Sequence, residues 1–142
     1  MLSVQPSPVV KWSQNKSHIF ITLKLSHRWD SPPCLNTKSN HTYLSNTQLK
    51  TKLVCYSSHF NLTFNLELDF YSAIFVEVDE NNETMVELKR DGVGVYTIIC
   101  EKEVEKVWFY LSKEEKNYPI WESISSEYEG EHQIYQKYHD NK

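Results

Sequence analysis

The 142-residue sequence predicts an all-β protein, a compact antiparallel β-sandwich of about seven to eight strands. Three observations favour this class. Apolar and polar residues alternate with a period of two in several runs, turn-forming residues separate those runs, and no long segment has a helical period. The runs recur every 10–15 residues or so, a spacing typical of a sandwich.

The first clear strand is predicted at residues 19–25, where Ile, Ile, Leu and Leu lie on one face. Residues 48–56 repeat the pattern with lysine and threonine between the apolar positions. Residues 60–68 show the most regular alternation in the chain. Each run therefore predicts a strand with one buried face and one face in water.

A hairpin is predicted between residues 84–89 and 93–102, with its turn at Arg90-Asp91-Gly92, because Asp-Gly tolerates the positive φ of tight turns. Residues 31–46 are rich in Ser, Asn, Pro and Thr, so we expect a loop with at most a short strand there. Residues 113–116 have the composition of a single helical turn.

One domain is expected over residues 8–121, between a flexible N-terminus (1–7) and an acidic, mobile tail (122–142). Trp12 and Trp108 are expected in its core. The net charge of −4 combines +6 in residues 1–60 with −10 in residues 61–142. Such a balance argues against nucleic acid as a partner.

The cysteines are odd in number and contain no CxxC, which favours free thiols in a reducing compartment for Cys34, Cys55 and Cys100. We expect Cys55 and Cys100 to be buried and inert. The six histidines show no ligand spacing, so no metal and no cofactor are expected. No run of 18 apolar residues, glycine-rich phosphate loop or catalytic set is visible, so the sequence predicts neither a membrane partner nor an enzyme.

Three pieces of the chain, in order, resemble the CS domain, the HSP20-like fold of the Hsp90 co-chaperone p23. The first is Pro8-Val9-Val10-Lys11-Trp12-Ser13-Gln14, and the second is Leu66-Glu67-Leu68-Asp69-Phe70-Tyr71-Ser72-Ala73-Ile74. The third is Ile99-Cys100-Glu101-Lys102 followed by Trp108-Phe109-Tyr110-Leu111-Ser112-Lys113-Glu114. The Trp-x-x-Leu-Ser/Thr-Lys-Glu piece favours the p23 branch, and the resemblance covers about residues 8–121.

The resemblance implies a cytoplasmic co-chaperone, with the nucleus as a second location. Such a protein would bind the N-terminal and middle domains of Hsp90 in the ATP-bound closed state, slow its ATPase and stabilise complexes with client proteins. It assigns partner binding to the residues of its last piece: Trp108, Leu111, Ser112, Lys113 and Glu114. Trp12 and Lys102 are expected to be structural, with a surface role as the other reading.

The sequence also departs from the family. Phe109-Tyr110 replaces the Pro-Arg of the signature, and the loop at residues 26–47 is longer. Ser13 and Ala73 stand where some relatives have the Tyr and Cys credited with prostaglandin synthase chemistry, so that activity is not implied. These departures leave an alternative open, in which the chain is a CS-domain adaptor or passive client-holding chaperone without ATPase regulation. For single residues the simpler readings also stay open: core packing for Trp108 and Trp12, and a solvated turn for Lys113 and Glu114.

Overall fold

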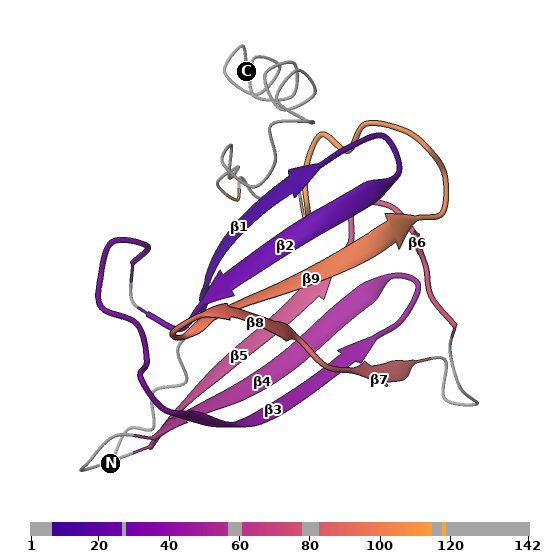
Figure 1. Ribbon diagram of the computed structural model, residues 1–142. Helices are drawn as coiled ribbons and strands as arrows, with labels where there is room; N and C mark the ends of the chain where they lie inside the picture. The colour runs from indigo at the N-terminus through magenta and orange to yellow at the C-terminus, as the bar shows by residue number, and fades with distance from the viewer. Residues whose placement is uncertain (1–6, 27, 57–60, 78–82, 115–117, 119–142) are drawn as a thin grey trace.

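Two antiparallel sheets face each other in the computed structural model, which describes residues 7–26, 28–56, 61–77, 83–114 and 118 (Figure 1). The first sheet has the strand order β1-β2-β9-β6, with β8 also paired to β9, and the second has the order β5-β4-β3-β7. The strands of the first sheet are β1 (Val9–Gln14), β2 (His18–Lys24), β6 (Ile74–Phe75), β8 (Lys89–Gly92) and β9 (Val95–Lys102). Those of the second are β3 (Thr37–Leu44), β4 (Gln48–Tyr56), β5 (Asn61–Asp69) and β7 (Thr84–Val86). The described residues contain no helix, and the sandwich predicted from the sequence is confirmed.

The core forms from alternate residues of facing strands, as the period of two predicts. In the first sheet, Trp12, Ile21 and Ile98 lie side by side across β1, β2 and β9, and all three are buried. In the second sheet, Leu53 pairs with Phe64 across β4 and β5, again with both side chains buried. The apolar faces of the two sheets therefore pack on each other, and each fully buried Leu or Ile contributes about 1.5–3 kcal/mol.

Three local expectations were wrong. The tight turn lies at Val93-Gly94, and Gly94 has the left-handed φ of 67°, whereas Gly92 belongs to β8. Residues 84–86 pair with β3 in the second sheet, so the chain crosses between sheets on both sides of β7. Residues 37–44 form an eight-residue strand where a loop was expected, because β3 pairs along most of its length with β4.

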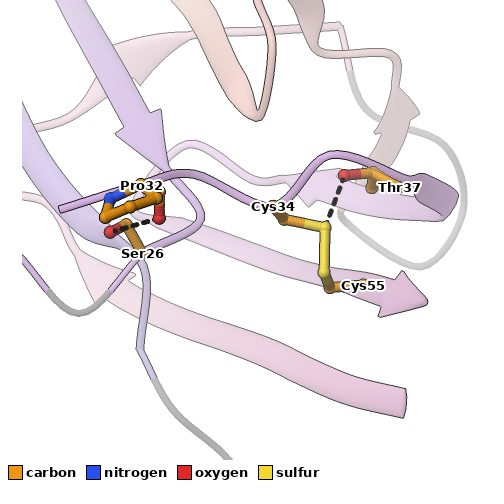
Figure 2. Close-up of a disulfide and its surroundings, with 5 residues drawn as sticks. All are labelled: Ser26, Pro32, Cys34, Thr37 and Cys55. Atoms are coloured by element: carbon orange, nitrogen blue, oxygen red, sulfur yellow. Dashed lines mark hydrogen bonds between the residues drawn. A yellow bond between two sulfur atoms is a disulfide. The ribbon is translucent and has the colours of Figure 1, made fainter. Parts of the chain in front are cut away.

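A disulfide joins Cys34 to Cys55, with 6.0 Å between their Cα atoms (Figure 2). Cys34 lies in the connection between β2 and β3, which turns back so that Thr37 pairs with Cys55 and donates a hydrogen bond to Cys34 Sγ at 3.7 Å. The expectation of free thiols at Cys34 and Cys55 was therefore wrong. Cys34 and Cys55 are 21 positions apart, and the pairing of β3 with β4 brings them together. Their spacing in the sequence could not reveal this disulfide. Cys100 is a buried free cysteine, as expected.

Several expectations concern residues outside the described ones: the tail at 122–142, nearly all of the N-terminus at 1–7, and residues 115–116 of the single helical turn. Lys113 and Glu114, from the same stretch, lie in a turn. Within the described ranges, no helix is long and apolar enough to cross a membrane.

Candidate functional site

The segment that follows β9, residues 103–114, folds back onto the end of β5. Tyr71 N donates to Leu111 O at 3.0 Å, and Lys113 N donates to Asp69 O at 2.8 Å. Between these bonds, Phe70 and Ser112 form an antiparallel bridge. We call residues 103–114 the folded-back segment. It carries all five residues to which the resemblance assigns partner binding.

Trp108 holds this segment against the sandwich. Its side chain is fully buried, and its ring lies 6.0 Å from that of Phe70 and 6.2 Å from that of Tyr71, centroid to centroid. Tilted aromatic pairs at such distances add about 0.5–1.5 kcal/mol to the gain from burial alone. Core packing, the simpler reading of Trp108, is what the structure displays.

The side-chain amide of Gln14 fixes the backbone of Trp108. Gln14 Nε2 donates to Trp108 O at 2.8 Å, and Trp108 N donates to Gln14 Oε1 at 2.9 Å. The amide thereby pairs with Trp108 much as a neighbouring strand would. Because Gln14 is only 2% exposed, its loss would leave both backbone groups buried without these partners.

Lys102, the last residue of β9, completes this arrangement from inside the protein. Its ammonium donates to Gln14 Oε1 at 2.9 Å, Asn15 O at 2.6 Å and Lys106 O at 2.7 Å. An ammonium has three donors and no acceptor, so it fixes the orientation of the Gln14 amide, with Oε1 toward Lys102. The bond to Lys106 also closes the first turn of the folded-back segment. A structural role for Lys102, 5% exposed, fits these contacts.

Phe109 and Tyr110, which replace the Pro-Arg of the resemblance, both pack around Tyr71. The Tyr71–Phe109 rings meet edge to face at 6.4 Å, and the Tyr71–Tyr110 rings are tilted at 6.2 Å. Tyr71 thus contacts three consecutive aromatic residues, counting Trp108. The departure from the signature replaces a cation with an aromatic cluster.

The five predicted partner-binding residues divide into two groups. Trp108, Leu111 and Ser112 are buried, whereas Lys113 and Glu114 are exposed. A partner that binds the surface of this conformation can therefore contact Lys113 and Glu114 directly. The other three residues can affect such a partner only by determining the shape of the segment. Their contact with a partner stays a prediction.

Tyr118 lies near this exposed end of the segment. Its backbone carbonyl accepts a hydrogen bond from Trp12 Nε1 at 3.1 Å, so it also marks where the chain passes β1. Burial raises the pKa of the Tyr118 phenol, and the negative charge of Glu114 raises it further. Trp12 itself is 1% exposed, in line with a structural role.

Sequence reasoning assigned no role to Gln14 or Tyr71. A signal for Gln14 was present, because it lies two positions after Trp12 on a strand and so faces the same, inward side. A polar side chain at an inward position needs buried partners. Tyr71 carried no such signal, since its contacts depend on how residues 103–114 return to β5.

The described residues contain no group of three His, Cys, Asp or Glu side chains close enough to hold a metal ion. The outer face of the second sheet has an open hollow of about 540 Å³, whose polar lining includes His41, Lys50 and Glu67. A second hollow of about 300 Å³ lies beside β9 at Ile98 and Ile99. Both are partly open to solvent, unlike the enclosed pockets that bury small ligands.

Comparison with known proteins gave no family model that matches this chain and no match among curated proteins.

Proposed function

We propose that this chain is a p23-like co-chaperone that binds Hsp90 in its ATP-bound closed state, slows ATP hydrolysis and stabilises client complexes. The partner surface is the N-terminal and middle domains of Hsp90. The proposal carries no enzymatic activity, cofactor, nucleic acid or membrane. It rests on the ordered resemblance of three sequence pieces, which falls on a chain that folds as a two-sheet antiparallel sandwich.

One structural observation carries the proposal further: the folded-back segment is anchored along its length and presents Lys113 and Glu114 in an exposed turn. Anchoring matters because a rigid segment loses little conformational entropy on binding. The buried Trp108 and Leu111 supply that rigidity.

The mechanism is a population shift. A protein that binds only the closed state of Hsp90 favours that state by no more than its difference in affinity for the two states. Steady-state ATP turnover slows because Hsp90 in the closed complex cannot reopen for the next cycle until the co-chaperone leaves or the bound ATP is hydrolysed. Client complexes persist for the same reason.

The test is a pull-down of Hsp90 with and without a non-hydrolysable ATP analogue. Binding should require the analogue and should weaken in the variant Lys113→Ala/Glu114→Ala. The matched control is Lys50→Ala/Glu67→Ala, another exposed Lys and Glu, which pair across β4 and β5 on the outer face of the second sheet. Equal binding with and without nucleotide, or no binding, would contradict the proposal.

A second candidate, the adaptor or passive client-holding chaperone, is favoured by the aromatic cluster at Tyr71. Phe109 and Tyr110 occupy the place of Pro-Arg, so no arginine is offered to Hsp90 at that position. Suppression of client aggregation with an unchanged Hsp90 ATPase rate would support this candidate over the first.

The location that we propose is the cytoplasm, with the nucleus as a second location. There the Cys34–Cys55 pair would meet a reducing glutathione pool, whereas disulfides persist mainly in oxidising compartments. Alkylation of thiols in intact cells, followed by mass spectrometry, decides the point. Cys34 and Cys55 recovered fully as the disulfide would argue against this location.

A further inference from the structure

Two lysines converge on one tryptophan ring at the edge of the first sheet. Lys11 Nζ lies 4.4 Å from the ring centroid of Trp29, and Lys24 Nζ lies 5.8 Å from it. Lys24 Nζ also donates a hydrogen bond to Trp29 O. Trp29 belongs to the connection between β2 and β3, which projects beside β1 in Figure 1. The Trp29 ring is thus held by cations from both β1 and β2.

The strand register makes this a patch on the outer face of the sheet. Lys11 pairs with Thr22 and Lys24 with Val9, so the two lysines are diagonal neighbours on adjacent strands. We call Lys11, Lys24 and Trp29 the Trp29 patch. Arg28 and Asp30, both exposed, flank Trp29 in the chain, so their opposite charges offset each other.

The cations of the Trp29 patch have no carboxylate oxygen within 4.0 Å in the described part of the chain, where the one ion pair is Lys16–Glu105. The two lysine ammonium groups repel each other, and each is attracted to the face of the Trp29 ring. An anionic group placed over the patch would relieve the repulsion. The electrostatics therefore favour an acidic occupant.

The sequence after Tyr118 contains a segment with matching charge. Glu127, Glu129 and Glu131 alternate with Tyr128 and Gly130. In an extended conformation, residues two apart point to the same side and lie about 6.6–6.8 Å apart. Carboxylates on one side of such a segment would then face both lysines of the patch at once.

The position of Tyr118 puts this segment within reach. Its carbonyl is bonded to Trp12 Nε1, and Trp12 is the neighbour of Lys11 on β1. Because β1 is an edge strand of the first sheet, the chain can pass around it to the outer face. The nine residues from Tyr118 to Glu127 span up to about 30 Å when extended. A tether of this length gives an effective concentration in the millimolar range.

We propose that residues 127–131 bind across the Trp29 patch of the same molecule, with their carboxylates on Lys11 and Lys24. The contact is electrostatic, so it forms at low ionic strength and weakens as added salt screens the charges. An acidic partner would have to displace this segment before it could use the patch. The inference is independent of Hsp90 binding, which we assign to Lys113 and Glu114.

The test is zero-length carbodiimide cross-linking of the full chain, with the cross-linked peptides identified in the monomer fraction by mass spectrometry. The expected products join Lys11 or Lys24 to Glu127, Glu129 or Glu131. They should clearly exceed the products of the same glutamates with Lys50 or Lys52, which lie on β4 in the other sheet. They should largely disappear at about 1 M salt, where the Debye length is about 3 Å.

Two controls keep the outcome interpretable. The local pair Lys16–Glu105, at 3.6 Å, should cross-link in every low-salt sample and shows that the chemistry worked. The variant Glu127→Gln/Glu129→Gln/Glu131→Gln removes the expected products, whereas Glu122→Gln/Asp140→Asn, which alters other acids after Tyr118, should keep them.

Three outcomes would overturn the proposal. One is cross-linking of the glutamates to Lys50 and Lys52 as often as to Lys11 and Lys24. Another is the expected product in dimers alone, which would place the segment on a second copy. The last is Lys16–Glu105 cross-linking with no product from residues 127–131.

Discussion

Substitution of Gln14 by Met tests whether the buried amide anchors the folded-back segment. Methionine has a similar volume but can neither donate nor accept these hydrogen bonds. The change removes the bonds of 2.8 and 2.9 Å to Trp108 and that of 2.9 Å from Lys102. A buried group left unsatisfied costs about 1–3 kcal/mol, and more when it is charged. Because the three bonds share one side chain, their costs are not additive. We expect the free energy of unfolding to fall by about 3–5 kcal/mol, as when one member of a buried charged network is removed.

The assay is urea unfolding followed by tryptophan fluorescence, with a check that the slope against urea is unchanged. The matched control is Ser13→Ala, because Ser13 is 1% exposed and its hydroxyl has no hydrogen-bond partner within the described residues. Removing a buried hydroxyl that has no partner relieves a desolvation cost of about 1–3 kcal/mol, so this variant should be at least as stable as the parent protein. Amide hydrogen exchange at Tyr71 and Lys113 measures detachment of the segment itself and should accelerate in Gln14→Met. If Gln14→Met matches Ser13→Ala in stability and leaves both amides protected, the anchoring argument is refuted.

Other predictions follow from the cysteines and from Gly94. Replacing Cys34 and Cys55 by Ala should lower the free energy of unfolding by about 3 kcal/mol, the loop-closure entropy of a 21-residue separation, measured by urea unfolding without reductant; an unchanged midpoint would contradict it. Burial raises the pKa of the Cys100 thiol from 9.0 to about 12, so above pH 9 the unfolded chain loses this proton while the folded protein keeps it. This contribution to stability is complete below pH 9 and falls as the pH rises toward 12, by about 2 kcal/mol near pH 10.5; Cys100→Ala should flatten that part of the pH profile, and an equally steep profile would count against it. Gly94→Ala should lower the melting temperature, because φ is +67° and the added Cβ would lie 2.6 Å from Cys34 O; the left-handed backbone alone costs about 1–2 kcal/mol.

The sheets could be predicted from the sequence where one face of a strand is apolar. A shift of one residue in the register of such a strand would turn its apolar side chains to water, so the register is fixed. The buried residues Ile19, Ile21 and Leu23 display the period of two that results. The strand β3 escaped prediction because its inward side is partly polar. Thr42 is fully buried there and shares a hydrogen bond of 2.7 Å with Thr51 instead of packing as an apolar side chain.

Features set by distant contacts could not be predicted from local patterns. The turn forms at Gly94 because the connection bearing Cys34 approaches so closely that a Cβ would meet Cys34 O and Pro33. The Asp-Gly pair at residues 91–92 is a common turn signal, but it has no such contact to decide the position. A second contact of this connection, with β4, allows the disulfide between Cys34 and Cys55.

For the candidate site, the resemblance points to one segment, and the structure divides its residues between two kinds of position. Trp108 and Leu111 are fully buried, so a variant at either position changes the fold before it changes any contact. Loss of Hsp90 binding in such a variant would therefore say little about the interface. Lys113 and Glu114 are exposed, and their truncation should leave stability within about 0.5 kcal/mol. Because Gln14→Met perturbs the anchor while leaving both exposed side chains in place, comparing it with Lys113→Ala/Glu114→Ala separates the shape of the segment from the contacts that it offers.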